Sequence, residues 1–305
     1  MSFSSEAKAE LCRMNRRKKC CAVAEAYGVV LYCNSFTPRE IRIITGSEEF
    51  ASLLPKLFKR AFGVSFDSLP EAGGKPGGRK TLLMTDRDKI AEVFRAFGME
   101  PEDTLSLHIN LGVLENDCCK ASFVRGAFLA GGSMTDPSKR YHLELATTHA
   151  AVGREMCALL GELGFEPGQA VRGASFLAYF KQSEAIADFL TTVGADVSAL
   201  EIMSARVEKD MRNEINRKVN CDSANADKIV AAAAEQLEAI RQIELEQGLD
   251  TLPEGLQQAA LLRIANPEAS LAELAALSQP SVTKSCLSHR LKRLIAIARE
   301  GTSEE

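Results

Sequence analysis

The chain has 305 residues, of which 46% are hydrophobic and 26% charged, with a formal net charge of −4. This length and apolar content allow two or three folded domains and exclude a disordered linker. No apolar run is long enough to cross a membrane, and no secretory signal segment is evident, so we expect a cytoplasmic protein without a membrane partner. The mild acidity excludes a uniformly basic nucleic-acid coat, so local clusters of cations matter more than the sum.

The middle of the chain repeats its beginning. The segment 20–31 opens on two adjacent cysteines and continues as an apolar stretch with a glycine near its centre, Gly28. The segment 118–132 does the same, with Gly126 at the equivalent place. We interpret the repeat as an internal duplication.

Each copy continues with the same series of elements. Alternating apolar and polar residues predict strands, and apolar residues at helical spacing predict helices. The expected elements are a strand at 39–44, a helix at 49–62, a strand at 80–84 and a helix at 90–98, then a strand at 140–145, a helix at 150–163, a strand at 175–180 and a helix at 186–194. Both closing helices end at a glycine, which is typical of helix C-caps.

The nine cysteines of the chain do not have the spacing of a metal site. No two of them form a C-x-x-C pair, and no two histidines stand at ligand spacing. We interpret the adjacent pairs Cys20-Cys21 and Cys118-Cys119 as reduced side chains, with at least one of each pair packed as a small apolar group. Because nucleophile-elbow and dinucleotide-binding motifs are also absent from the sequence, we predict no metal, no cofactor, no small-molecule substrate and no enzymatic activity.

The C-terminal part of the chain is predicted to be all-helical. Strong helix formers indicate helices over 225–247 and 253–264, and a short amphipathic helix follows over 271–277, with Ser270 as its N-cap. A last helix is expected over 282–298, where Ser281 offers the cap.

The last two helices resemble a helix-turn-helix arrangement, in which the second helix enters the DNA major groove. The second helix is basic and has no acid on its outward face. Side chains near its start can reach base edges, and cations further along suit phosphates. The residues expected at base edges are Ser281, Thr283, Lys284, Ser288 and His289, and those expected at phosphates are Arg290, Lys292 and Arg293. The alternative is an ordinary helical hairpin with a basic surface.

A polar and basic segment precedes this domain. Its composition is typical of a connector that itself contacts DNA, and the candidate residues are Arg212, Asn216, Arg217, Lys218, Asn220 and Asn225. The expected domains are 1–112 and 113–203 for the two halves of the duplication, 204–224 for a linker and 225–305 for the helix-turn-helix domain.

Three parts of the chain resemble the bacterial WhiA family. They are 123–133 (FVRGAFLAGGS) with the following 141–144 (YHLE), 216–225 (NRKVNCDSAN) and 288–294 (SHRLKRL). The resemblance implies an α+β fold: a duplicated LAGLIDADG homing-endonuclease-type αββαββα domain with two antiparallel sheets, then an all-α helix-turn-helix domain similar to the promoter-reading domain of sigma factors.

The same resemblance implies a function. Members of the family are transcriptional regulators tied to sporulation, cell division or chromosome segregation. The expected partners are double-stranded DNA at promoters and other transcription or division proteins, and the expected localisation is nucleoid-associated.

The resemblance also raises the alternative that the first domain still cuts DNA. LAGLIDADG nucleases place a metal-binding carboxylate at the eighth position of each motif helix. Counted from Leu129, this position is Asp136, and its ungapped equivalent in the first copy is Pro38. Because one carboxylate cannot build the paired metal site, we predict that cleavage is lost and that Asp136 is a turn residue.

The strands of this fold form a saddle along DNA, but here they carry few cations, chiefly Arg39, Arg42, Lys80, Lys139 and Arg140. An active metal-dependent endonuclease and a protein adaptor that does not bind DNA remain the two alternatives to the regulator.

Overall fold

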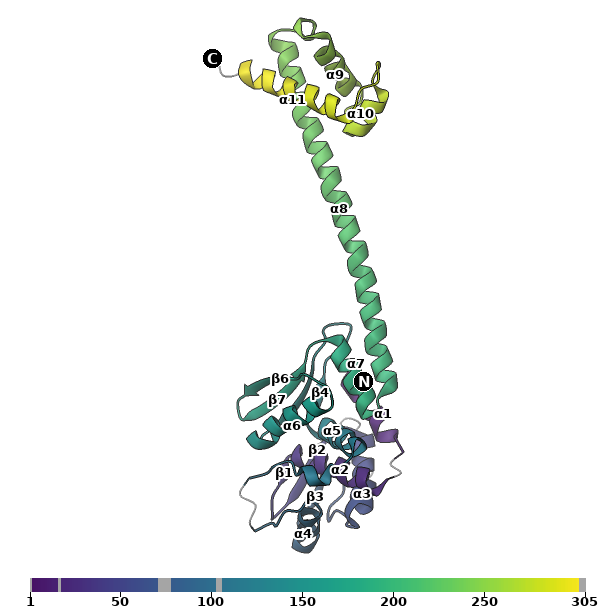
Figure 1. Cartoon of the computed structure of the whole chain (residues 1–305), viewed down its shortest axis with the longest axis vertical. Helices are drawn as coiled ribbons and strands as arrows, with labels where there is room; N and C mark the ends of the chain where they lie inside the picture. The colour runs from purple at the N-terminus through teal and green to yellow at the C-terminus, as the bar shows by residue number, and fades with distance from the viewer. Residues whose placement is uncertain (1, 16–17, 71–77, 103–105, 302–305) are drawn as a thin grey trace. The chain divides into compact units, whose positions relative to one another are not determined.

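The computed structural model describes residues 2–15, 18–70, 78–102 and 106–301 (Figure 1). The chain divides into two compact units, Met1–Asp210 and Met211–Glu305. Within the described ranges, no helix combines the length and the apolar character that crossing a membrane requires.

The N-terminal unit repeats one order of elements twice. After α1 (Phe3–Arg13), the first half contains α2 (Lys19–Leu31), β1 (Ser35–Phe36), β2 (Ile41–Thr45), α3 (Glu48–Phe62), β3 (Lys80–Met84) and α4 (Arg87–Ala96). A 3-10 turn, η1 (Leu111–Val113), leads into the second half, which contains α5 (Asp117–Gly131), β4 (Gly132–Met134), β5 (Leu143–Thr147), α6 (Ala150–Glu162), β6 (Gly168–Arg172), β7 (Ser175–Phe180) and α7 (Ser183–Val193). The predicted duplicated α+β fold is confirmed.

Each half builds one antiparallel sheet, and the helices bury its inner face. The strand order is β1-β2-β3 in the first sheet and β4-β5-β7-β6 in the second. An isolated bridge between Ser68 and Leu83 lies where the first sheet would need a counterpart of β6. Sequence patterning misses β6 because most of its side chains are exposed and no apolar alternation marks it. The predicted bounds 80–84 and 175–180 agree with β3 and β7, whereas β2 and β5 begin two to three residues later than expected.

The two halves join where α2 crosses α5 at paired glycines. A Cβ atom on Gly28 would lie 2.0 Å from the carbonyl oxygen of Phe123, and one on Gly126 would lie 2.0 Å from that of Glu25. Gly28 and Gly126 are as far apart in the sequence as Glu25 and Phe123, so the contact has two-fold pseudosymmetry. Only glycine allows this approach, since any Cβ would overlap the opposite backbone. The crossing therefore depends on the same glycine in each copy.

Around the crossing lies one continuous core. Tyr27 of α2 stacks on Phe97 with ring centroids 4.1 Å apart and meets Phe123 of α5 edge to face. The core thus packs both copies into a single unit.

The predicted helix ends at glycine also hold, because Gly98 and Gly194 have φ of 68° and 95°, which lie in the left-handed region.

The helix α8 (Asp196–Glu246) begins in the N-terminal unit and ends in the C-terminal one. Its start is capped by α1, since the Glu10 carboxylate accepts hydrogen bonds from the Val197 and Ser198 backbone amides at 2.8 and 3.0 Å. The expected linker 204–224 is helical throughout and contains the boundary between the two units.

The C-terminal unit is all-helical. The end of α8 is followed by the 3-10 turn η2 (Leu249–Thr251), α9 (Glu254–Ala265), α10 (Leu271–Leu277) and α11 (Lys284–Gly301). The helix α10 has the predicted bounds, and Ser270 caps it in a capping box with Glu273. The small core of this unit joins Ile240 and Ile243 of α8 to Leu274 of α10 and to leucines of α11.

The start of the last helix differs from the prediction. We expected the helix from residue 282 with Ser281 as its cap, but α11 begins at Lys284. The Thr283 hydroxyl accepts the Cys286 amide at 3.2 Å, which makes Thr283 the cap. The Ser278 hydroxyl accepts the Val282 amide at 3.0 Å and holds the preceding residues in a turn. The connection between α10 and α11 is therefore six residues, Ser278 to Thr283.

Candidate nucleic-acid interface

The helix α11 has one buried and one exposed side. Leu287, Leu291 and Leu294 recur at helical spacing and are at most 1% exposed. The positions on the opposite side of the helix are Ser285, His289, Lys292 and Arg293, and all four are exposed. We call these four residues the outer face of α11.

The predicted base-reading residues divide between this face and its surroundings. His289 lies on the outer face, and Lys284 is exposed at the first position of the helix. Ser281 lies in the turn, Thr283 is engaged as the cap, and Ser288 is half-buried. Ser285 was missed, although its spacing of four from His289 places both on one face.

The predicted phosphate ligands also differ from one another. Within the described residues, neither Lys284, His289 nor Lys292 forms an ion pair with a carboxylate. Arg293 approaches Glu300 at 3.4 Å across an exposed surface. The guanidinium of Arg290 instead lies against α9, since a Cβ on Gly255 would stand 3.3 Å from its Cζ atom. Arg290 therefore packs within the unit, whereas Lys284 and Lys292 are exposed cations available to a phosphate.

A buried arginine holds the scaffold behind α11. Arg263 of α9 is 2% exposed, and its guanidinium donates to the Gln236 side chain of α8 at 2.9 Å. It also donates to the Ala269 carbonyl at 2.7 Å, just before α10 begins. Burial lowers the pKa of Arg263 from its ordinary value. This one side chain thus ties α8, α9 and the entry to α10 together.

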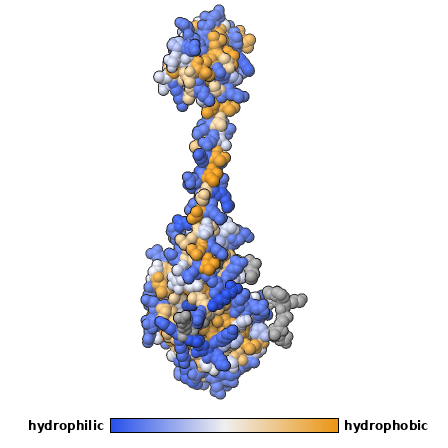
Figure 2. Space-filling model, turned by 90° about the vertical axis from the view of Figure 1, so that its right-hand side faces the viewer, coloured by the Kyte–Doolittle hydropathy of each residue, from blue (hydrophilic) through white to orange (hydrophobic). Residues whose placement is uncertain are grey.

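The predicted connector residues are all exposed on α8, but they do not share one face. Arg212, Asn216 and Asn220 follow one another at a spacing of four and lie along one side. Arg217, Lys218 and Asn225 fall on other sides. Figure 2 shows hydrophobic side chains exposed along this helix as well. Met211 and Ile215 of α8 are each 60% exposed.

Several cations of the two sheets are already paired with carboxylates. Arg42 on the outward face of β2 lies 3.5 Å from Glu40, and Lys80, on the inner side at the start of β3, lies 3.0 Å from Glu48 of α3. In the second sheet, Glu144 lies 3.2 Å from both His142 and Arg172. Partial burial alone would raise the pKa of Glu144, but His142, Arg172 and Ser133 together lower it. Arg42, Lys80 and Arg172 thus balance carboxylates of the protein itself, whereas the exposed Arg39, Lys139 and Arg140 form no ion pair with a carboxylate among the described residues.

The ends of the two motif helices carry no nuclease carboxylates. Because α5 ends at Gly131, the count from Leu129 to Asp136 runs off the helix and was wrong as a position on it. Asp136 accepts hydrogen bonds from the Ser138 amide and hydroxyl at 2.8 and 2.7 Å, as the predicted turn residue should, and these bonds lower its pKa. The last turns of α2 and α5 contain no acid. At the end of α5, the Lys8 ammonium donates to the Leu129 carbonyl at 3.1 Å, and burial lowers the pKa of Lys8 to about 8.

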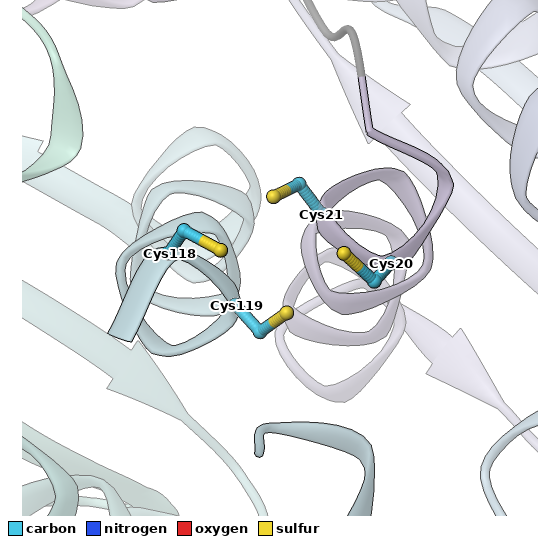
Figure 3. A group of neighbouring side chains, drawn as sticks. All are labelled: Cys20, Cys21, Cys118 and Cys119. Carbon is cyan, nitrogen blue, oxygen red and sulfur yellow. The ribbon is translucent and has the colours of Figure 1, made fainter. Parts of the chain in front are cut away.

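At the other end of the motif helices, four cysteines meet. Figure 3 shows their sulfur atoms pointing toward one another between the starts of α2 and α5, and all four lie within 4.8 Å of one another. We call Cys20, Cys21, Cys118 and Cys119 the four-cysteine cluster. Burial raises the pKa of Cys119 to about 12, whereas a hydrogen bond from Cys21 lowers that of Cys118. Local spacing could not reveal this cluster, because the duplication brings together two pairs that are far apart in the sequence.

These features define a class of protein in which a duplicated LAGLIDADG-like α+β domain is followed by a helix-turn-helix domain. Residues 120–212 match the family model described as the WhiA LAGLIDADG-like domain, and residues 215–298 match the WhiA C-terminal HTH domain. The chain belongs to the WhiA family.

Relatives of known name support this assignment over the whole chain. A protein of Ruminiclostridium cellulolyticum named probable cell division protein WhiA is 36% identical and is matched over 98% of this chain and 97% of its own length. A protein of Desulforudis audaxviator with the same name is 35% identical over 98% and 97%. The crystal structure of full-length WhiA from Thermatoga maritima covers 98% of this chain and 99% of its own, with 26% identity and a TM-score of 0.59.

Proposed function

We propose that this protein is a sequence-specific DNA-binding transcriptional regulator that acts at promoters and has no endonuclease activity. This proposal depends mainly on the outer face of α11. Its Lys292 and the neighbouring Lys284 are exposed and pair with no described carboxylate. Such cations exchange bound counterions for DNA phosphates, which is the main source of affinity for nucleic acid.

Direct readout in the major groove requires donors and acceptors on the same helix as these cations. His289 and Ser285 provide them on the outer face, and Lys284 adds a donor at the start of the helix. The exposed side of α8 with Arg212, Asn216 and Asn220 adds a second surface to which DNA phosphates can bind.

The chemistry of the motif helices supports the proposed absence of cleavage. A two-metal nuclease needs carboxylates that hold two cations at the scissile phosphates. The described ends of α2 and α5 supply none, and the carbonyl of Leu129 already accepts from Lys8. The names of the relatives point to cell division, and we extend the proposal to genes of division, sporulation or chromosome segregation.

The test is to incubate the full chain with labelled genomic DNA fragments, with and without Mg²⁺, and to measure retention and strand integrity across a salt series. The proposal predicts selective retention of intact fragments that weakens as salt rises. Lys292→Ala should lower the slope of log affinity against log salt by about one. The matched control Arg241→Ala removes an exposed arginine of α8 in the same unit and should leave the slope unchanged.

Mg²⁺-dependent strand breaks would contradict the proposal in favour of the nuclease. Equal loss of retention in Lys292→Ala and Arg241→Ala would contradict the role of α11. No retention at any salt concentration would favour the protein adaptor.

A further inference from the structure

The four-cysteine cluster lies on the pseudo-two-fold axis of the N-terminal unit. Each motif helix contributes its second and third residues, and the equivalent cysteines of the two copies are as far apart in the sequence as Gly28 and Gly126 at the crossing. A tetrahedron has two-fold axes, so a repeated pair of ligands can supply all four of its corners. The duplication thereby builds a complete ligand set from one dipeptide used twice.

The distances suit a thiolate-bound metal ion. Sulfurs that each lie about 2.3 Å from a central zinc ion stand about 3.8 Å from one another in a tetrahedron. All four sulfurs already lie within 4.8 Å of one another (Figure 3). The widest pair is therefore at most about 1 Å farther apart than in that tetrahedron.

The helix starts and a nearby ammonium favour negative charge at the cluster, whereas burial opposes it at Cys119 by raising the pKa of that thiol. Four thiolates around a divalent cation carry a net negative charge, and the positive ends of two helix dipoles point at them. The described N-caps of α2 and α5, Lys18 and Asn116, make no side-chain cap hydrogen bond. The charge of Lys18 also acts on Cys118. Helix dipoles and a nearby ammonium thus stabilise the same negative charge.

An ion can reach the cluster from solvent. A pocket beside the helix starts is lined by Lys19, Cys20, Gly112, Asn116 and Cys119. Cys20 is exposed and Cys119 is buried, so the cluster extends from the surface into the core. This arrangement gives both an entry path and a low-dielectric side, as stable metal sites require.

We propose that the four-cysteine cluster binds one thiophilic divalent cation, Zn²⁺, in a structural site that ties α2 to α5 at their N-terminal ends. Binding forms four metal–sulfur bonds and releases the thiol protons to solvent. The site is independent of DNA recognition and lies outside the proposed function of α11.

The test uses the full chain, reduced and freed of metal, titrated anaerobically with Co²⁺ and then with Zn²⁺. Tetrahedral Co²⁺ bound by four thiolates has intense sulfur-to-metal charge-transfer absorption and intense d–d absorption bands in the visible range. We expect these bands to saturate at one Co²⁺ per chain and to disappear when Zn²⁺ is added. Cys118→Ser should lose them, and Cys286→Ser, which alters an exposed cysteine of α11, should keep them.

Thermal unfolding is a second measurement that tests zinc binding even if Cys118→Ser folds poorly. Zn²⁺ should raise the Tm of the N-terminal unit in the wild type and in Cys286→Ser, and a chelator should reverse the rise. Weak octahedral Co²⁺ bands or an unchanged Tm would overturn the proposal. So would oxidation of the four thiols by dissolved oxygen to Cys20–Cys119 and Cys21–Cys118 disulfides in the presence of Zn²⁺ and without reductant, measured by thiol counting and peptide mass.

Discussion

The two sheets and the outer face of α11 both carry basic side chains, but the two regions differ in which of these side chains pair with a carboxylate of the protein. On the sheets, Arg42, Lys80 and Arg172 each pair with a carboxylate of the same unit. On α11, Lys292 has no such partner within the described residues, whereas Arg293 lies 3.4 Å from Glu300, about as close as Arg42 lies to Glu40. A count of cations alone would treat the two surfaces as similar.

The difference lies in which charges remain free to neutralise a phosphate. A paired cation must give up its own carboxylate before it binds DNA, whereas an unpaired one exchanges only mobile counterions. Part of the basic charge on the duplicated unit is therefore neutralised internally, whereas Lys284 and Lys292 of the small helical unit carry charge that no described carboxylate neutralises.

We expect the largest effect from Gly126→Val, which should unfold the N-terminal unit and leave the C-terminal unit folded. Gly126→Val places a branched side chain where a Cβ would already lie 2.0 Å from the Glu25 carbonyl oxygen. Forcing α2 and α5 apart should destabilise the N-terminal unit by at least about 3 kcal/mol. Calorimetry should show loss of its transition while the transition of the C-terminal unit persists.

The matched control is Gly161→Ala near the end of α6, where a Cβ has open space. It should leave stability unchanged or slightly raised. If both variants lost the same transition, the close glycine crossing would not be what joins the two halves.

A second substitution removes the support behind α11. Arg263→Met takes away the donor to Gln236 and to the Ala269 carbonyl, and it leaves buried acceptors without partners. We expect a loss of about 1–3 kcal/mol from the C-terminal unit, measured by chemical denaturation. Arg241→Met, an exposed substitution on α8, should cost much less. If Arg263→Met kept the wild-type stability, the free energy needed to desolvate the buried guanidinium would equal the free energy that its hydrogen bonds contribute.

Two substitutions in α11 should separate sequence preference from affinity. His289→Ala should change the preferred sequence by roughly 1 kcal/mol of discrimination at one base pair, with the salt slope retained. Lys284→Ala should also change the preference, because Lys284 stands at the start of the helix. Selection from a randomised DNA library measures both. An unaltered preference in both variants would mean that α11 does not read bases.

We expect the smallest effect from Asp67→Asn, which should change how the free energy of unfolding of the N-terminal unit depends on acid pH. The Lys89 ammonium and the backbone amides of Thr85 and Asp86 donate to Asp67, and they lower its pKa to about 2 from 3.8. The ionised form is therefore favoured in the folded state, and its contribution to stability is present above pH 3.8 and is lost as the pH falls toward 2. Asp67→Asn should lower the free energy of unfolding at neutral pH and flatten its decline over that interval. A wild-type pH dependence in Asp67→Asn would contradict this role of the Asp67 carboxylate.

Local patterns in the sequence were sufficient for much of this fold. The helix α10 with its capping box, the strands β3 and β7 and the glycines that end α4 and α7 are all encoded within a few residues. The duplication was also legible, because the two copies keep the same order of elements. Each of these features depends on neighbours in the chain and not on distant contacts.

What the sequence could not reveal depends on tertiary contacts. The edge strand β6 has no buried alternation, and its pairing with β7 is what defines it. The orientation of Arg290 toward Gly255 follows from how α9 packs on α11. The four-cysteine cluster exists only because α2 and α5 lie side by side, so no spacing within either pair predicts it.

The measurement that tests the account most directly compares salt-dependent DNA retention by two double variants of the full chain. Lys292→Ala with Arg293→Ala removes cations from α11, and Arg42→Ala with Arg172→Ala removes the same number from the sheets. We predict that the first pair lowers both affinity and salt slope, while the second leaves them close to the wild type. A larger loss from the Arg42 and Arg172 pair would contradict the account and return DNA binding to the saddle.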